Sequence, residues 1–498
     1  MLFASFDFVL FFIPVLLGYW LLARRPVWRW LLLLGASYFF YCASAKPPAG
    51  PWPTPWYYVG LIVASTLMDY GVGRLIAASS RRLYRNLSLS ISLVGNLGML
   101  GYFKYAGFFL EVTSEIAHLW GIPVRVPSLH LALPIGISFY TFQSLSYTID
   151  VWRGRIQAER SLLRFAAYVA FFPQLVAGPI ERPQNLLPQF YQKHEVDYDR
   201  ITSGLKRMAW GLFMKVVIAD RLARYVNVVY NEPTSFLGLT TIVATFFFAF
   251  QIYCDFAGYS HMAIGAAEVM GFKLMRNFDR PYLSRSISEF WSRWHISLSS
   301  WFRDYVYIPL GGNRVARPRW YYNLFITFLL SGLWHGANWT FVIWGALNGF
   351  YLIFSLITTD LRASVAKAVG LAQRPALHNV VRILITFGLT TFAWIFFRAN
   401  NLTDALHVIS ASLHRPTPHQ ILPDILRAEG ITKIEVAFDL LLIAGLMWFE
   451  AQRGMVSVAE KFRAQPAWVR WPAYYAICMS IWFLGISGEA KAFIYFQF

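Results

Sequence analysis

The stretch Phe328-Leu-Leu-Ser-Gly-Leu-Trp-His-Gly-Ala-Asn-Trp-Thr-Phe-Val-Ile-Trp344 has no formally charged side chain and is apolar enough to enter a bilayer. Within it His335 is a polar, titratable ring, and such a group at membrane depth usually marks a pathway or a reaction centre. Histidine is also well suited to accept a proton near neutral pH. We expect the chemistry of this protein at His335; a satisfied core histidine is the alternative.

The composition indicates a membrane protein. The 498 residues are 57% hydrophobic, 18% aromatic and 14% charged, whereas soluble proteins carry roughly 25% charged residues. The net charge of +18 fits cytoplasmic loops, which collect Arg and Lys, better than it fits nucleic-acid binding. The three cysteines lie far apart in apolar runs and predict neither a disulfide nor a metal site.

Hydropathy predicts about a dozen membrane spans, each near the length needed to cross the hydrocarbon core. The chain shows no internal repeat and no soluble domain, so we predict an all-α polytopic membrane protein with a single integral domain over residues 1–498. The predicted spans are 2–23, 30–45, 56–73, 87–110, 134–151, 208–230, 237–262, 321–336, 339–358, 379–397, 436–449 and 471–488.

The distribution of basic residues predicts the orientation of these spans. Loops 24–29 and 74–85 are rich in Arg, whereas the loop between them holds Lys46 alone. This alternation places the N-terminus outside the cytoplasm. By the same rule residues 272–319 lie inside and 399–435 outside, and an even number of spans puts the C-terminus outside too.

Two segments are predicted to enter the membrane without crossing it. Residues 165–180 are apolar but interrupted by Pro and Gly, which favours a re-entrant hairpin whose irregular backbone is buried in protein. Residues 290–305 are predicted to form an amphipathic helix in the cytoplasmic interface, anchored by Trp. Its aromatic stripe recurs at helical spacing and comprises Trp291, Trp294, His295, Leu298 and Phe302.

Two further polar residues qualify as candidates. Asp255 lies in an apolar span and is either a functional group or a buried acceptor for a nearby Arg or Tyr. His295 and His335 are 40 residues apart and each is flanked by Trp. This pattern favours a common polar pocket.

Several stretches carry a resemblance to a known family. They are Leu133–Asp150, Phe172–Ile180, Tyr253–Ser260, Phe290–Asn313, Leu333–Trp339 and Phe493–Phe498. They resemble the membrane-bound O-acyltransferase (MBOAT) family, in particular the bacterial branch of the alginate O-acetyltransferase type that acetylates exported polysaccharides. The core motifs occupy residues 133–350.

The resemblance implies a ring of about twelve transmembrane helices around a central funnel, in the bacterial inner membrane. A thioester donor, acetyl-CoA by expectation, would arrive from the cytoplasm, and no bound cofactor is expected. The acceptor would be a hydroxyl of an exported polysaccharide such as alginate. It would be reached directly or through a periplasmic acetyltransferase partner.

The resemblance also assigns site residues. The invariant histidine of the family corresponds to His335, expected to deprotonate the hydroxyl, and the second catalytic position to His295. His295 or Asn338 would orient the ring or hydrogen-bond the oxyanion. The Trp residues would exclude water. Arg293 and Arg303 would steer an anionic donor, or they reflect only the general excess of basic residues in cytoplasmic loops, which is the favoured alternative. The expected substrate-binding residues are Asn338, Trp334, Asp255, Trp291, Trp294, Gln143, Tyr140 and Arg303.

A transporter or flippase of envelope precursors, with the histidines as a proton relay, is the alternative from another functional class. The missing inverted repeat argues against it. The sequence also lacks a P-loop and the H-E-x-x-H pattern of zinc proteases.

Overall fold

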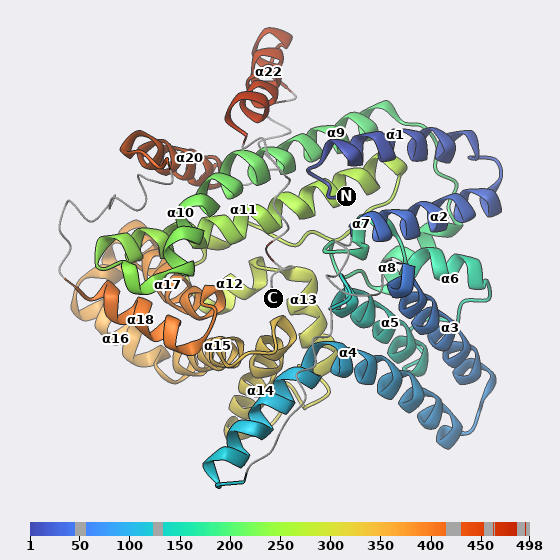
Figure 1. The fold of residues 1–498 in the computed structure, drawn as a ribbon, viewed down its shortest axis with the longest axis horizontal. Coiled ribbons are helices and arrows are strands. Elements are labelled where there is room, and N and C mark those ends of the chain that lie inside the picture. Colours follow the sequence, from blue (N-terminus) through green and yellow to red (C-terminus); the bar gives the residue numbers. More distant parts are fainter. Residues whose placement is uncertain are drawn as a thin grey trace. The chain divides into compact units, whose positions relative to one another are not determined.

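The computed structural model describes residues 1–44, 56–122, 133–414, 430–452, 462, 464–485 and 494, and these ranges contain helices and no strand (Figure 1). The all-α prediction is confirmed. The chain divides into two compact units, unit 1 with residues 1–208 and 259–275, and unit 2 with residues 209–258 and 276–498. A single integral domain stays a prediction. Lys46 and all of Phe493–Phe498 except Ile494 lie outside the described residues.

The helices of unit 1 are mostly long, with a group of short ones in its second half. They are α1 (Phe6–Leu21), α2 (Pro26–Ser44), α3 (Trp56–Ala78), α4 (Arg82–Leu119), α5 (Ile137–Trp152), α6 (Leu162–Val169), α7 (Phe172–Leu175), α8 (Pro183–Leu186) and η1 (Leu187–Tyr191). Two further helices contribute residues to both units, α9 (Tyr198–Phe213) and α11 (Leu239–Met270).

Unit 2 contains the remaining helices. They are η2 (Met214–Ala219), α10 (Asp220–Asn231), η3 (Pro233–Ser235), η4 (Pro281–Leu283), α12 (Ile287–Arg293), α13 (Ile296–Phe302), η5 (Arg303–Tyr307), α14 (Arg317–His335), α15 (Trp339–Ile357), α16 (Thr359–Ala368), η6 (Leu371–Gln373), α17 (Pro375–Arg398), α18 (Leu402–Ser412), α20 (Lys433–Ala451) and α22 (Ala467–Leu484).

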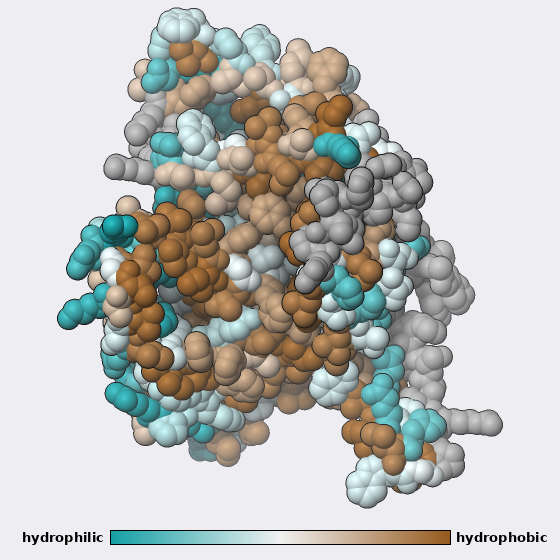
Figure 2. All heavy atoms as spheres, turned by 90° about the vertical axis from the view of Figure 1, so that its left-hand side faces the viewer, coloured by the Kyte–Doolittle hydropathy of each residue, from teal (hydrophilic) through white to brown (hydrophobic). Residues whose placement is uncertain are grey.

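Each predicted span overlaps a helix, and four described helices are both long and apolar enough to cross a bilayer. These four are α3 from Tyr58 onward, α11, α15 and α17. Figure 2 shows the side on which α16, α17 and α18 lie in Figure 1, and hydrophobic side chains cover much of it. On α17 the exposed apolar side chains include Leu384, Ile385 and Leu389. Such a face is what a helix in contact with lipid presents.

A buried polar cluster joins three helices of unit 1. Asp69 on α3 accepts hydrogen bonds from Ser92 Oγ at 2.6 Å and from Asn96 Nδ2 at 2.9 Å, both on α4. Ser92 also lies 3.0 Å from the hydroxyl of Thr148 on α5. Because buried polar groups stabilise a fold only when their hydrogen bonds are satisfied, this cluster fixes how α3, α4 and α5 pack.

The predicted re-entrant segment forms the short helices α6 and α7, and every residue from 165 to 180 is buried. Pro173 lies in the first turn of α7, where its missing N–H costs nothing. The backbone N–H of Phe172 donates to Ser37 Oγ on α2 at 3.0 Å. The expected burial of this irregular backbone is thereby confirmed.

Candidate active site

His335 ends α14 in unit 2 and is 5% exposed. Three aromatic rings surround it edge-on. The ring centroids of Trp334, Trp344 and Phe397 lie 4.9, 5.0 and 5.1 Å from that of His335. The imidazole is therefore held in a shielded position, with little room to change its rotamer.

The backbone places His335 through a close contact between two helices. A Cβ on Gly345 of α15 would lie 2.5 Å from the carbonyl oxygen of Phe328 and 3.1 Å from Cα of Gly332, both on α14. Real Cβ atoms do not approach that closely, so α14 and α15 pack main chain against main chain only because glycine occupies both positions. This contact fixes the turn 336–338 that follows His335.

His295 lies between α12 and α13, where the expected continuous helix is interrupted. The prediction of one helix over residues 290–305 was therefore wrong. His295 has φ 44° and ψ 53°, a left-handed conformation that His adopts more readily than most residues. The bend is held by Asn277, whose carbonyl oxygen accepts from Ile296 N at 2.9 Å and whose Oδ1 accepts from Ser297 Oγ at 2.6 Å. These long-range contacts override the local helical pattern.

The rings of His295 and His335 come together as expected, with centroids 6.5 Å apart. Each ring nitrogen lies about 1.1 Å from its centroid, so no nitrogen pair is closer than about 4 Å, which is longer than a direct hydrogen bond. The gap suits one intervening group such as a hydroxyl. Phe256 lies edge-on to His295 at 4.6 Å.

The tryptophans of the predicted stripe are buried in protein and do not serve as interface anchors. Trp291 is 9% exposed and Trp294 is 1% exposed. Trp291 contacts Trp344 at 5.6 Å, and Trp294 contacts Trp394 on α17 at 5.0 Å. The interfacial-anchor interpretation was wrong, because the broken helix folds its aromatic residues inward.

Three further aromatic residues pack with Trp291, Trp294 and His335 and were not predicted from the sequence: Trp344, Trp394 and Phe397. We call these aromatic residues together the aromatic wall. Trp344 and Trp394 stack at 5.8 Å, and Phe397 lies 5.3 Å from Trp344. A signal was present in the sequence, since Trp within an apolar span needs a partner for its N–H and is less common there than at the membrane interface.

Two cavities in unit 2 lie toward opposite ends of the α14–α15 hairpin. The first has a volume of about 460 Å³ and is lined in part by Trp291, Arg303 and Ser331. The second has about 500 Å³ and is lined in part by Gly336 and Asn338. Ser331 precedes His335 by one helical turn, and Gly336 follows it directly. His335 thus lies along the chain between the residues that line the two cavities.

Asn338 is engaged in holding the turn after His335. Its Oδ1 accepts from Thr340 N at 2.9 Å and caps α15, while its Nδ2 donates to the Asn400 carbonyl at 3.2 Å. Both polar atoms of the Asn338 amide are thus engaged with neighbouring backbone groups. Neither of its predicted roles, orienting the ring or hydrogen-bonding the oxyanion, is seen in these contacts.

Asp255 forms part of a buried ion cluster. Its Oδ1 lies 2.7 Å from Lys215 Nζ, and its Oδ2 accepts from the backbone N–H of Ile494 at 2.8 Å. Lys215 also pairs with Asp220 at 2.8 Å. Asp255 is thus a buried acceptor, and its described partners are a lysine and a backbone amide in place of the expected Arg or Tyr.

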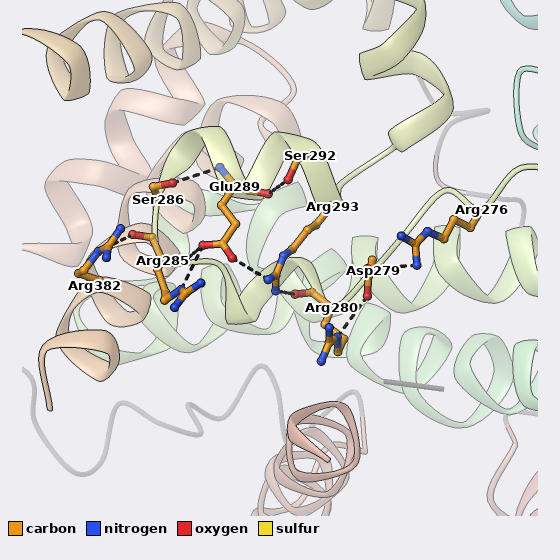
Figure 3. Close-up of polar contacts among 9 residues, drawn as sticks. All are labelled: Arg276, Asp279, Arg280, Arg285, Ser286, Glu289, Ser292, Arg293 and Arg382. Carbon is orange, nitrogen blue, oxygen red and sulfur yellow. Dashed lines mark hydrogen bonds and ion pairs between the residues drawn. The ribbon is translucent and has the colours of Figure 1, made fainter. Parts of the chain in front are cut away.

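The two arginines expected to steer the donor differ in their surroundings. Arg303 is 62% exposed on its side chain and lies 2.9 Å from Asp304. Arg293 Nη2 lies 2.6 Å from Glu289, which also accepts from the backbone N–H of Arg285 at 2.7 Å (Figure 3). Figure 3 also shows Arg276 and Arg280 turned toward Asp279, at 3.1 and 3.2 Å. The contacts of Glu289 tie Arg285 and Arg293 to α12, which carries Trp291.

Gln143 and Tyr140 belong to unit 1. Gln143 is buried, and its Nε2 donates to the backbone carbonyl of Tyr168 at 2.8 Å. Tyr140 is 1% exposed, also on α5. A substrate-binding role for either residue stays a prediction. Among the described residues, no group of three His, Cys, Asp or Glu side chains could hold a metal ion.

Comparison with known proteins identifies the family. Residues 153–397 match the family model described as MBOAT, membrane-bound O-acyltransferase family. The chain is 43% identical over 422 residues to a probable alginate O-acetylase of Pseudomonas aeruginosa, which covers 82% of this chain and 74% of that protein. It is 40% identical over 466 residues to the probable alginate O-acetylase of Azotobacter vinelandii, covering 91% and 86%.

The chain is also similar to a relative that is named for a different acceptor. A peptidoglycan O-acetyltransferase of Helicobacter pylori is 37% identical over 435 residues, covering 81% of this chain and 78% of that protein. Together with the apolar helices, these matches show that the chain is a membrane O-acyltransferase and belongs to the membrane-bound O-acyltransferase family.

Proposed function

We propose that this protein is an O-acetyltransferase that moves an acetyl group from a cytoplasmic thioester donor, acetyl-CoA, to hydroxyl groups of an exported polysaccharide of the alginate type. The position of His335 on the α14–α15 hairpin, between residues that line one cavity and residues that line the other, carries this proposal. A base in that position can meet a donor from one side and an acceptor from the other.

The proposed reaction is a single acyl transfer. A sugar hydroxyl is a weak nucleophile at neutral pH, so His335 accepts its proton as the oxygen attacks the thioester carbonyl. This attack forms the C–O bond and a tetrahedral oxyanion. The C–S bond breaks when the oxyanion collapses to the ester, and the imidazolium returns the proton to the leaving thiolate. His295 faces the same gap and hydrogen-bonds the oxyanion or orients the base.

The first cavity is the proposed donor side. Arg303 at its lining provides a positive charge for an anionic donor, and Trp291 lies where the cavity meets the aromatic wall. Trp334, Trp294 and their neighbours keep bulk water from the thioester, which would otherwise be hydrolysed. The second cavity, beyond His335, is the proposed acceptor side.

The proposed setting is the bacterial inner membrane. About twelve helices form a ring around a central funnel, and both termini lie outside the cytoplasm. The basic residues of 272–319 support a cytoplasmic position for the donor side. Acetyl passes to the polymer either directly or through an extracytoplasmic acetyltransferase partner.

The test uses purified protein in lipid nanodiscs with acetyl-labelled acetyl-CoA. The expected result is transfer of label to the polysaccharide, or to an added extracytoplasmic partner, and loss of both in His335→Gln. Label that stays on the donor with every acceptor, while a labelled precursor crosses vesicle membranes, would support the transporter alternative instead.

A further inference from the structure

We propose that the second cavity recognises an acidic sugar residue of the acceptor, with Arg398 binding its carboxylate. This inference rests on the proposed function and adds the residue and the cavity that would recognise the carboxylate of such an acceptor. The cavity is lined by nine residues of unit 2, among them Asn227, Asn231, Arg398 and Asn400, and by no Asp or Glu. We call it the Asn–Arg cavity.

Arg398 is the charged group of this cavity and is 6% exposed. It ends α17, and its guanidinium lies over the ring of Tyr230, 5.3 Å from the centroid. Its Nη2 donates to Asn227 Oδ1 at 3.1 Å and to Asn231 Oδ1 at 3.3 Å. Packing and two hydrogen bonds therefore hold the guanidinium in one orientation.

Among the described residues, no carboxylate balances the positive charge of Arg398. Within the described ranges Arg398 forms no ion pair, and its hydrogen-bond acceptors are neutral amides. A buried charge is costly unless it is paired, whereas a bound anion would remove that cost. Planar, forked donors of this kind match a carboxylate in particular.

The amides around Arg398 suit a sugar. Asn227 and Asn231 turn their oxygens toward the guanidinium, and across the described parts of the chain their Nδ2 atoms make no hydrogen bond. These nitrogens remain as donors for hydroxyl or ring oxygens. Gly336, in the same lining, directly follows His335, so a sugar bound here presents hydroxyls close to the proposed base.

The first experiment measures binding without turnover. His335→Ala protein in nanodiscs is titrated with a short oligo-uronate, with its carboxyl-reduced neutral counterpart and with a phosphate-bearing glycan of equal length. We expect the uronate to bind about tenfold or more tighter than the neutral sugar, the effect of a charge-assisted hydrogen bond. Equal affinity for the acidic and neutral sugars, or tighter binding of the phosphate-bearing glycan, would overturn the assignment.

Two variants localise the effect. Arg398→Gln should abolish the preference for the uronate. Asn231→Asp places a carboxylate beside Arg398 at an exposed position, so it should weaken uronate binding while leaving the melting temperature unchanged or higher. The matched control is Arg382→Gln, which removes one charge from the same helix about 24 Å away. A preference that survives in both variants, or that is lost equally in the control, contradicts the proposal.

A transfer assay separates this inference from the proposed function. If protein with an intact His335 transfers no acetyl to any acceptor, the proposed function fails. If it transfers acetyl equally well to acidic and neutral acceptors, with the same KM in Arg398→Gln, only the acidic-sugar inference fails. Recognition of an extracytoplasmic partner protein through Arg398, with no oligosaccharide binding at all, also overturns it.

Discussion

Lys215 and His335 are both buried polar groups of unit 2, but their surroundings differ. Lys215 lies 2.8 Å from Asp220 and 2.7 Å from Asp255, so its charge is compensated by other residues of the chain. His335 is enclosed by the rings of Trp334, Trp344 and Phe397. The first arrangement holds helices together, whereas the second shields the group that we propose as the base. Burial of a polar residue alone therefore does not identify a catalytic group.

Replacing His335 should have the largest effect on activity. His335→Ala should lower acetyl transfer by about 10² to 10⁴, the usual contribution of a general base. The protein should still fold, because the Gly332–Gly345 contact that places α14 does not involve the ring. Transfer rate and melting temperature are measured on the same nanodisc sample. Unchanged transfer would rule out His335 as the base.

Replacing Lys215 should lower the stability of the protein strongly and its activity only slightly, the reverse of the effect of replacing His335. Lys215→Met leaves two buried carboxylates facing one another, at a cost of about 3–5 kcal/mol in the free energy of unfolding. The yield and the melting temperature should fall, but transfer per folded molecule should fall far less than in His335→Ala. The exposed Lys206→Met is the control. A stable but inactive Lys215→Met protein would mean that the ion cluster takes part in the reaction.

Variants of His295 test whether one residue can both shape the backbone bend and take part in the reaction. His295→Ala forces a Cβ-bearing residue without a polar side chain into the left-handed conformation, at about 1–2 kcal/mol. His295→Gly and His295→Asn tolerate that conformation. If the ring also acts on the oxyanion or on His335, all three variants lose about 10²-fold in kcat. Full activity in the Gly and Asn variants would show that His295 only shapes the bend.

The next smaller effect concerns the hairpin that carries His335. Gly345→Ala should lower the free energy of unfolding by about 1–3 kcal/mol, because the new methyl group meets the main chain of α14. Gly388→Ala on α17 is the matched control, since no atom lies within 4 Å of its added Cβ. The control should be neutral or stabilising, by about 0.5–1 kcal/mol. Equal stabilities of the two variants would contradict the close helix contact.

The partly buried ion pair between Glu289 and Arg293 on α12 should contribute least. Burial alone would raise the pKa of Glu289, but hydrogen bonds from Arg285 and the charge of Arg293 lower it below its ordinary value. The pair therefore contributes stability above the unfolded pKa, and this contribution is lost as the pH falls through the lowered folded value. Glu289→Gln should shift the melting temperature slightly at pH 7 and less in acid. A larger shift in acid than at pH 7 would contradict this sign.

Much of the fold and part of the site followed from the sequence. Apolar runs predicted the helices, and flanking Trp residues predicted that His295 and His335 share a pocket. The bend at His295 was not predictable, because it depends on Asn277, which the local pattern does not include. The pairing of Asp255 with Lys215 depends in the same way on tertiary placement.

The backbone contact between Gly332 and Gly345 fixes the proposed base independently of the residues that we propose to select its substrates. Since main-chain atoms fix where the hairpin carries His335, side chains that line the two cavities can be exchanged without displacing the imidazole. One invariant chemical step can then be combined with different donors and acceptors. New specificities are accordingly best sought by altering cavity walls such as those around Arg398, with the α14–α15 hairpin left untouched.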